Sequence, residues 1–289
     1  GYSSSGEVVQ TGKGVSDFHT GDRVVSNGNH AEYVVVNQNL CTRIPDNTDI
    51  KEASFTVLGS IALHGLRLSE TSLGSKVVVI GLGIIGQLVC RLAEAQGSEV
   101  IGIDPDTKRT DLSANFYTSV EEANMTNVDS VIITAATSSN EPIEVATKIA
   151  RNKAKIVVVG DIPLNISRND FYYKELELVV SKSYGPGRYD KQYEILGKDY
   201  PIEYVRWTEN RNFEAFIKLL SQNQIHLLDL VTEEVSFENA PSIYKKFSGE
   251  DKPLSVVLRY DNKSEPKIDL QRTVELEPKT EKVNLGILG

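Results

Sequence analysis

A short apolar run leads directly into three closely spaced glycines in this chain. Residues 77–80 are Val-Val-Val-Ile, and residues 81–86 are Gly-Leu-Gly-Ile-Ile-Gly. The apolar run has the composition of a strand buried on both faces, and the segment after the glycines, residues 85–96, has its apolar residues at helical spacing. The chain therefore contains a strand, a glycine-rich turn and a helix in the order used by dinucleotide-binding folds.

Each glycine of this loop has a mechanical task in such a unit. Gly81 makes the tight turn, Gly83 lets the backbone approach a pyrophosphate, and Gly86 lets the helix pack closely on the strand. The free N–H groups at the start of the helix, near Ile84 and Ile85, then bind the anion. A glycine-rich turn of an α/β protein without a ligand is the alternative interpretation.

Strands and helices alternate from residue 76 onward. Segments rich in Val and Ile have the length of buried strands at residues 76–80, 99–104, 128–135, 155–159 and 177–181. Helix-length segments such as 85–96 and 142–151 lie between several of them. This alternation is typical of a parallel sheet covered on both faces, so we predict an α/β fold with a doubly wound Rossmann sheet.

An acidic residue, Asp104, ends the second of these strands. A carboxylate about 20 residues after the first glycine accepts hydrogen bonds from the ribose of NAD and repels the 2′-phosphate of NADP. We therefore expect NAD as the cofactor. Lys108 and Arg109 follow closely and keep NADP as an alternative.

The segments on either side of this alternation have other patterns. Gly and Asn separate short β-type runs at residues 6–9, 22–25 and 31–36, which predicts a small antiparallel β-structure. Residues 51–70 have helical spacing. A polar, aromatic stretch then occupies residues 184–212. Beyond it we predict a helix, a strand, a helix and a strand at 213–222, 230–237, 240–247 and 254–260.

Charge and cysteine content exclude several classes of protein. There are 31 Lys and Arg residues against 40 Asp and Glu residues, a formal net charge of −9. This excess of negative charge argues against sequence-independent binding to nucleic acid or to an anionic membrane. The two cysteines, Cys41 and Cys90, cannot build a disulfide framework. We therefore expect a reduced, cytoplasmic protein with no nucleic-acid or membrane partner.

Four further segments carry a resemblance to a known family: residues 1–9, 21–24, 30–33 and 255–260. Together with the phosphate loop they resemble motifs of the medium-chain dehydrogenase/reductase family. The resemblance implies a Rossmann domain beside a GroES-like, β-rich catalytic domain, and hydride transfer as the reaction.

A narrower resemblance extends over residues 62–67, 183–189 and 204–212. These segments look like bi-domain oxidoreductases, which join a dehydrogenase half to a Gfo/Idh/MocA-type half in sugar and surface-polysaccharide metabolism. The resemblance implies an internal fragment that is inactive by itself. The expected parts are a partial GroES-like catalytic domain (1–70 and 203–262), a Rossmann domain (71–202), a linker (263–282) and the first strand of a truncated second domain (283–289).

Zinc members of the family have metal ligands at positions that Tyr2, Ser3 and Ser60 occupy in this chain. Tyr and Ser are poor ligands for zinc, which prefers Cys, His and carboxylates. Residues 24–30 also leave no room for a cysteine-rich lobe. We therefore expect no zinc, with side chains alone supporting hydride transfer.

The resemblance also assigns residues to the nicotinamide end of the site. His64 lies where the family's helix approaches the nicotinamide, and its pKa near neutrality suits proton transfer; a locally packed histidine is the alternative. Thr137, Gly160 and Asp161 follow strands whose carboxyl ends face the ligand crevice, although Asp161 also fits a simple turn. By the same match Arg109 reaches the adenosine.

Aromatic and arginine side chains are concentrated in residues 184–212. They suit stacking on a sugar and pairing with phosphate or carboxylate. An ordinary protein–protein interface is the alternative interpretation, since such interfaces have a similar composition. The substrate candidates are Tyr184, Arg188, Tyr189, Arg206 and Trp207.

Two functions stay open at this point. The first is an NAD-dependent, zinc-independent oxidoreductase acting on a sugar or nucleotide-sugar. The second is a dinucleotide-binding or scaffolding half whose attached domain does the chemistry. The strand near residues 177–183 is expected to form the sheet edge, where unpaired backbone groups favour a homodimer unless another domain covers them.

Overall fold

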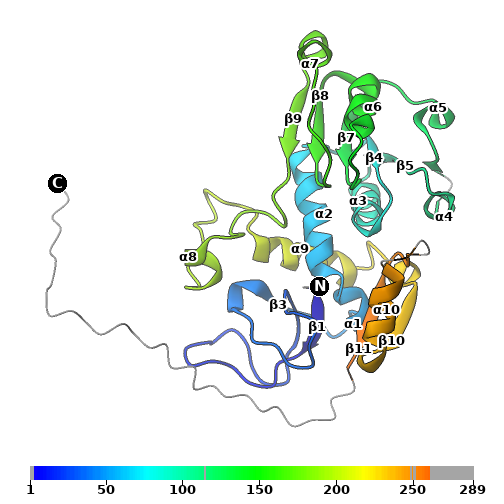
Figure 1. Cartoon of the computed structure of the whole chain (residues 1–289). Coiled ribbons are helices and arrows are strands. Elements are labelled where there is room, and N and C mark those ends of the chain that lie inside the picture. Colours follow the sequence, from blue (N-terminus) through cyan, green and yellow to red (C-terminus); the bar gives the residue numbers. More distant parts are fainter. Residues whose placement is uncertain (1–2, 114, 248, 250–251, 261–289) are drawn as a thin grey trace, which may run out of the picture.

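The computed structural model describes residues 3–113, 115–247, 249 and 252–260. Figure 1 shows a large sheet at one end of the molecule and a small sheet at the other. The two long helices α2 (Thr56–Leu68) and α9 (Glu209–Ser221) lie between the sheets. Among the described residues, none of the helices has both the length and the apolar composition that a membrane span requires.

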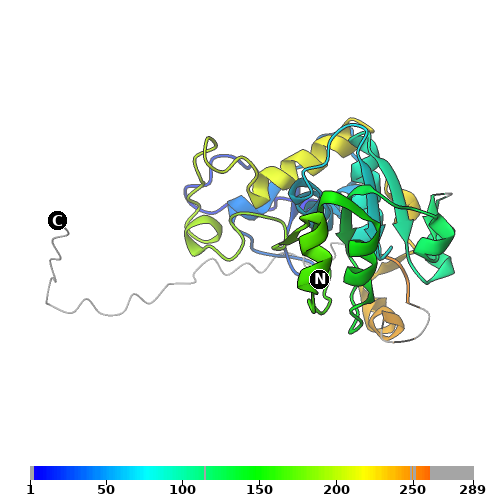
Figure 2. The same ribbon diagram turned by 90° about the horizontal axis from the view of Figure 1, so that it is seen from above.

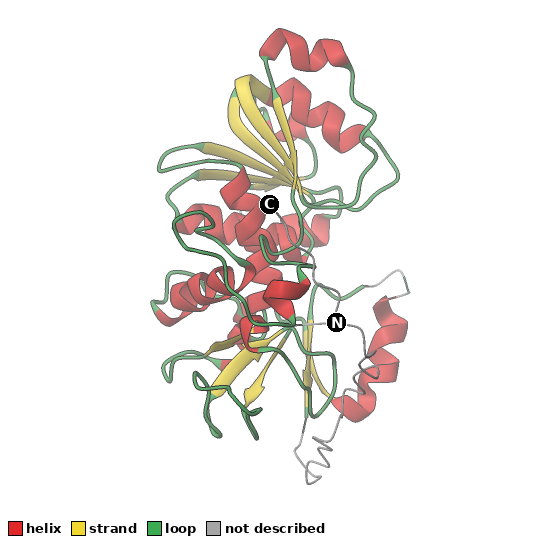
Figure 3. Cartoon of the chain, turned by 90° about the vertical axis from the view of Figure 1, so that its left-hand side faces the viewer, coloured by secondary structure: helices red, strands yellow, loops and turns green. Residues whose placement is uncertain are grey.

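The large sheet has six parallel strands in the order β6-β5-β4-β7-β8-β9. Its strands are seen side by side, in yellow, in the upper part of Figure 3. Along the chain, the first strand of this sheet is the central strand β4. The next two, β5 and β6, lie on one side of it, and β7, β8 and β9 then follow on the other side. This order confirms the predicted doubly wound Rossmann sheet. The strands are β4 (Lys76–Ile80), β5 (Glu99–Ile103), β6 (Phe116–Tyr117), β7 (Val128–Ile133), β8 (Ala150–Val158) and β9 (Glu177–Val180).

Helices cover both faces of this sheet (Figure 2). Val77 and Val79 of β4 belong to a core shared with α2, α3 and α9. Val78 and Ile80 belong to a second core, shared with α6. Successive side chains of a strand point to opposite faces, so burial on both sides explains the continuously apolar strands. The helices between the strands are α3 (Ile84–Ala95), α4 (Thr107–Thr110), α5 (Val120–Ala123), α6 (Glu141–Ile149) and α7 (Arg168–Lys174).

The small sheet is antiparallel, as predicted. Its strands are β1 (Ser4–Glu7), β2 (Arg23–Ser26) and β3 (Cys41–Arg43). The predicted strand at 31–36 is wrong, because this segment has no strand structure. Val35 in its centre is 87% exposed, so its apolar side chain faces away from the core.

The predicted helix at 51–70 is two helices, α1 (Ile50–Ala53) and α2. Asp49 caps α1 by accepting hydrogen bonds from two backbone N–H groups of its first turn. α2 packs against both α3 and α9. A Cβ at Gly59 of α2 would lie only 2.1 Å from the ring of Phe216 of α9, so a glycine is needed for this close crossing.

The last described part contains α8 (Lys191–Glu194), α9, β10 (Glu233–Ser236), α10 (Ala240–Phe247) and β11 (Val256–Arg259). β10 and β11 are parallel and α10 connects them. The helix predicted from residue 213 begins earlier, at Glu209, because the Thr208 side chain caps it. The predicted linker at 263–282 and the predicted strand at 283–289 lie outside the described residues.

Candidate functional site

The phosphate loop joins β4 to α3 through a backbone that favours glycine. Gly81 has a φ of +99°, and a Cβ there would lie 2.5 Å from a backbone nitrogen just after β7. A Cβ at Gly86 would lie 1.9 Å from the carbonyl oxygen of Gly81. Gly83 occupies the N-cap of α3, so the N–H groups of Ile84 and Ile85 stand in its first turn without intrahelical acceptors. This arrangement suits an anion.

Asp104 follows β5 and is 5% exposed. Its Oδ2 accepts a 2.7 Å hydrogen bond from the backbone N–H of Leu82, and its Oδ1 accepts one of 2.9 Å from the N–H of Asp106. The Arg109 Nη1 lies 3.3 Å from Asp104 Oδ2, and its Nε lies 3.3 Å from Asp106 Oδ2. A Cβ at Gly83 would lie 3.8 Å from Arg109 Nη1. Asp104 and Arg109 therefore meet beside the phosphate loop.

The carboxyl ends of β7 and β8 meet this loop. The Thr134 Oγ1 donates a 2.5 Å hydrogen bond to the carbonyl oxygen of Gly81. A Cβ at Gly160 would lie 2.0 Å from a carbonyl oxygen just after β7. The backbone N–H of Thr137 donates a 3.0 Å hydrogen bond to the carbonyl oxygen of Asp161. These predicted residues therefore share the edge of the sheet from which the phosphate loop emerges.

Sequence reasoning missed Thr134 and Ala135. Their backbone N–H groups donate to the carbonyl oxygen of Ile80 at 2.8 and 3.1 Å, which holds the phosphate loop against the end of β7. The prediction placed both residues inside a strand at 128–135. The strand ends at Ile133, so both residues lie in the loop that follows it. The sequence pattern does not indicate this earlier end.

His64 lies on the half-buried side of α2 that approaches the same edge. A Cβ at the next residue, Gly65, would lie 2.6 Å from the Val159 side chain, just after β8. A Cβ at Gly185 would lie 3.3 Å from His64 Nδ1. Burial, followed by the charge of Arg67, lowers the pKa of His64. The imidazole is therefore neutral at pH 7 and able to accept a proton.

Tyr184 is a core residue, because its side chain is 0% exposed. Its ring centre lies 5.4 Å from that of Phe213, and its hydroxyl oxygen accepts a 3.3 Å hydrogen bond from Asn27. Burial raises the pKa of Tyr184 to about 12. The structure thus places this predicted substrate residue beneath the surface.

Arg188 and Tyr189 lie above it. The Arg188 Nη1 lies 2.7 Å from Glu194 Oε1, and the Arg188 Cζ lies 4.2 Å from the centre of the Tyr189 ring. Tyr189 is 65% exposed. The structure also reveals a buried acid that the sequence did not indicate: Glu209, in the first turn of α9, is 0% exposed.

Arg206 and Trp207 meet a third residue, Arg67 of α2. The Cζ atoms of Arg67 and Arg206 lie 3.4 and 3.8 Å from the centre of the Trp207 ring. The Arg67 Nε donates a 3.0 Å hydrogen bond to Asn212 Oδ1. Arg67 is far from this segment in sequence, so sequence reasoning did not connect it with the site.

The positions expected to match zinc ligands do not offer suitable donors. The Ser3 Oγ donates to the Ser54 carbonyl oxygen at 2.5 Å and accepts from the Val57 N–H at 3.3 Å. Ser60 is fully buried, and Tyr2 lies outside the described residues. Across the described ranges, three or more His, Cys, Asp or Glu side chains nowhere gather as they would around a metal ion. The donor chemistry of these serines does not fit zinc.

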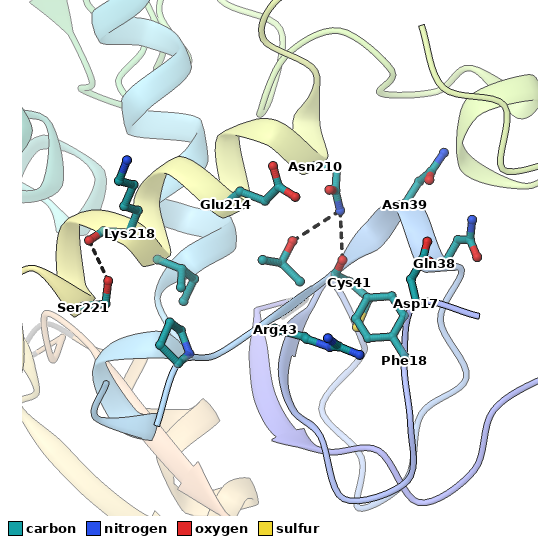
Figure 4. Close-up of a pocket in the computed structure, with 13 residues that line it drawn as sticks. Asp17, Phe18, Gln38, Asn39, Cys41, Arg43, Asn210, Glu214, Lys218 and Ser221 are labelled. Atoms are coloured by element: carbon teal, nitrogen blue, oxygen red, sulfur yellow. Dashed lines mark hydrogen bonds between the residues drawn. The ribbon is translucent and has the colours of Figure 1, made fainter. Parts of the chain in front are cut away.

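A separate cavity of about 510 Å³ lies between β3 and α9 (Figure 4). Asn210 of α9 and Cys41 both line the cavity, and the Asn210 Nδ2 donates a 2.9 Å hydrogen bond to the carbonyl oxygen of Cys41. Burial raises the pKa of the Cys41 thiol to about 12. The charged residues that line the cavity are Asp17, Arg43, Glu214 and Lys218. The predicted cofactor and substrate residues are absent from this lining, so the cavity is distinct from the phosphate-loop site.

A protein-family model matches the part of the chain that contains the phosphate loop. The family model for the D-isomer specific 2-hydroxyacid dehydrogenase, NAD binding domain, matches residues 59–170. This range contains the phosphate loop, Asp104 and the strand ends after β7 and β8. The match supports an NAD(P)-binding Rossmann domain.

Two relatives match a larger part of the chain. D-guloside 3-dehydrogenase of Escherichia coli (strain K12) is 25% identical over 265 residues, which cover 84% of this chain and 71% of that protein. The 2-dehydro-3-deoxy-L-galactonate 5-dehydrogenase of Pseudoalteromonas atlantica is 26% identical over 246 residues, which cover 68% of this chain and 70% of that protein.

A crystal structure of galactitol-1-phosphate dehydrogenase from Escherichia coli has the same fold. It matches with a TM-score of 0.73 at 21% identity and covers 89% of this chain and 83% of that chain. The sequence and fold comparisons together support a medium-chain, alcohol dehydrogenase-like chain with GroES-like and Rossmann parts.

Proposed function

We propose that this medium-chain dehydrogenase-like chain binds NAD and takes part in hydride transfer at a hydroxyl or carbonyl carbon of a sugar or polyol. The phosphate loop with Asp104 beside it carries the proposal. When bound, the cofactor supplies or accepts the hydride. The N–H groups of Ile84 and Ile85 at the start of α3 would hold the pyrophosphate, and Asp104 would accept hydrogen bonds from the ribose.

The ion pairs around Arg109 support NAD over NADP. Its guanidinium contacts the carboxylates of both Asp104 and Asp106. A 2′-phosphate would have to draw Arg109 away from these carboxylates and would meet their negative charge. NADP is therefore the weaker alternative.

The nicotinamide end of the site lies along Thr137, Gly160 and Asp161. His64 approaches the same edge from α2, because its neighbour Gly65 packs on Val159. Its lowered pKa keeps the imidazole neutral at pH 7. The proposed task of His64 is to take the hydroxyl proton when an alcohol is oxidised and to return it in the reverse direction.

Zinc independence is part of this proposal. Its support is the chemistry of Ser3 and Ser60, since serine hydroxyls are poor zinc ligands and Ser3 is hydrogen-bonded to the backbone of the α1–α2 turn. In a zinc-independent site the proton and the substrate oxygen must be handled by side chains.

A sugar-type substrate is supported by the names of two of the sequence relatives, which are dehydrogenases of a guloside and of a deoxygalactonate derivative. The likeness of residues 62–67, 183–189 and 204–212 to bi-domain oxidoreductases favours a nucleotide-sugar or another sugar of surface-polysaccharide metabolism. Arg188, Tyr189, Arg206 and Trp207 are the proposed contacts.

A second candidate is a non-catalytic dinucleotide-binding half of a two-domain protein. It is favoured by the His64 imidazole, for which no hydrogen-bond partner is found within the described part of the chain. Nothing there fixes the ring in one orientation for proton transfer.

Because the 289-residue chain is expected to be inactive by itself, two measurements on one preparation of the longer protein that the resemblance implies separate these candidates. Calorimetry should show NADH binding, and absorbance of the reduced nicotinamide should show turnover with a panel of sugars and sugar alcohols. NADH binding with turnover supports the enzyme, whereas binding without turnover supports the non-catalytic half. Failure to bind NADH would refute both.

We also propose a homodimer through β9. This strand ends the six-stranded sheet and stops at Val180, earlier than the predicted 177–183 segment; the chain turns at Ser183, whose φ is +50°. Val180 on this edge is 59% exposed. An exposed, apolar edge strand favours pairing with a second copy.

A further inference from the structure

We infer that Arg67 and Arg206, held together by Trp207, form a binding site for the anionic group of the substrate, a carboxylate or a phosphate. The inference rests on the proposed function in one respect, since it names the substrate as an anionic sugar rather than a neutral one. The site itself is defined by contacts that do not involve the phosphate loop.

The indole of Trp207 contacts both guanidinium groups. The Cζ atoms of Arg67 and Arg206 lie 3.4 and 3.8 Å from the ring centre, which is stacking distance. Guanidinium groups stack well on Trp because they are planar and weakly hydrated. Two positive charges therefore share one aromatic side chain.

Asn212 fixes the orientation of Arg67. The Asn212 Nδ2 donates a 2.9 Å hydrogen bond to the carbonyl oxygen of Tyr184, which turns its Oδ1 toward the Arg67 Nε at 3.0 Å. Asn212 is 0% exposed, so this orientation is held in the core. Among the described residues, the two terminal nitrogens of Arg67 have no hydrogen-bond acceptor and are left for a ligand.

The charge of this pair is only weakly compensated within the described chain, where the Glu214 carboxylate interacts with Arg206 without forming an ion pair. Neither Arg67 nor Arg206 makes an ion pair there, whereas Arg188 and Arg211 pair with Glu194 and Asp199. Burial and the neighbouring Arg206 lower the pKa of Arg67 to about 10, because loss of solvation and charge repulsion both disfavour the protonated form. An anion would relieve both costs.

The position of the pair suits a remote group of the substrate. Arg67 lies one turn after His64 on α2, on the helix whose Gly65 packs against the end of β8. The anion would thus be held beside the proposed hydride-transfer edge and would orient the sugar with respect to it.

The test uses the fluorescence of Trp207, which is the single tryptophan of the chain. The 289-residue chain is titrated with glucitol, gluconate and glucitol 6-phosphate at constant ionic strength, and NADH binding is measured separately by calorimetry. We expect a saturable fluorescence change with gluconate, with glucitol 6-phosphate or with both, and none with glucitol. A response to one anion alone identifies the substrate as a sugar acid or as a sugar phosphate, and a response to both identifies it as an anionic sugar of either kind.

The decisive variant is Arg206→Gln, because Arg206 is exposed and its loss should not disturb folding. It should weaken anion binding roughly tenfold, the loss expected for one charge-assisted partner. Arg67→Gln should do the same. Arg168→Gln is the matched control, since Arg168 is also exposed and stacked on an aromatic ring, that of Tyr172 at 4.5 Å, but lies on α7.

Two outcomes would overturn the anion site: NADH binding without a saturable response to either anion, and a response that both arginine variants retain unchanged. Anion binding that is lost in these variants would uphold the site even if NADH failed to bind, in which case the dinucleotide proposal alone would be refuted.

Discussion

The backbone N–H of Leu82 donates a 2.7 Å hydrogen bond to Oδ2 of Asp104. This bond connects the turn of the phosphate loop to the end of the neighbouring strand, where the carboxylate is almost completely buried. The residue proposed to bind the ribose therefore also shapes the loop proposed to bind the pyrophosphate. A change of this carboxylate should therefore alter both the affinity for the dinucleotide and the structure of the phosphate loop.

Replacement of Asp104 by Ala should narrow the difference between the affinities for NADH and NADPH. The wild-type chain should bind NADH more tightly, because the carboxylate accepts ribose hydrogen bonds and repels the 2′-phosphate. The variant should also lose about 1–3 kcal/mol of stability, since the Leu82 N–H is left without its acceptor. Calorimetry with both cofactors and urea unfolding measure these effects.

Asp106→Asn separates the two effects. It removes the second carboxylate that contacts Arg109 but that makes no hydrogen bond to the loop at Leu82, so it should narrow the difference between the affinities for NADH and NADPH without the loss of stability expected for Asp104→Ala. Equal affinity of the wild-type chain for NADH and NADPH would contradict the assignment of NAD.

Protein purified without added zinc should contain well under one zinc ion per chain. Ser3 and Ser60 are the residues expected to stand at the zinc-ligand positions, and the Ser3 hydroxyl is already hydrogen-bonded to the backbone at Ser54 and Val57. Elemental analysis after dialysis gives the metal content. Stoichiometric zinc that survives dialysis would refute zinc independence.

The parallel sheet could be predicted because its strands are buried on both faces. Such strands are continuously apolar, and the strand predicted at residues 76–80 coincides with β4. The glycine spacing of the loop was equally informative, since the positive φ of Gly81 and the tight contact at Gly86 leave little room for other residues.

Other features depend on contacts that no local pattern contains. The apolar segment at 31–36 has the composition of a strand, but Val35 faces solvent. The Arg67 guanidinium lies on Trp207 only because α2 and the segment before α9 pack together. The burial of Glu209 could not be predicted either, because a glutamate in the first turn of a helix is ordinarily solvated.

Replacement of Val180 by Lys should convert the proposed homodimer into a monomer. Val180 is 59% exposed on edge strand β9, and a lysine on such an edge opposes strand pairing. Tyr173→Lys on α7 is the control, since Tyr173 is also exposed, at 78%, but lies outside the strand. Sedimentation velocity distinguishes the two states. A wild-type chain that sediments as a monomer would count against the dimer.

The free energy of unfolding should fall as the pH rises toward 8, because of Glu209. Burial, followed by the nearby charge of Glu194, raises the pKa of this fully buried carboxyl from its usual 4.5 to about 8. Between these values the folded state holds a proton that the unfolded state releases. Each pH unit in this window therefore costs up to about 1.4 kcal/mol of stability.

Glu209→Gln should remove this dependence, because the amide stays neutral throughout the window. The variant should match the wild-type chain in stability near the lower end of the window and exceed it near pH 8. Glu203→Gln, which changes an exposed carboxyl of the preceding segment, should leave the slope unchanged. Urea unfolding at a series of pH values gives the slopes, and an equal slope for the wild-type and Glu209→Gln chains would show that Glu209 titrates as an ordinary surface acid.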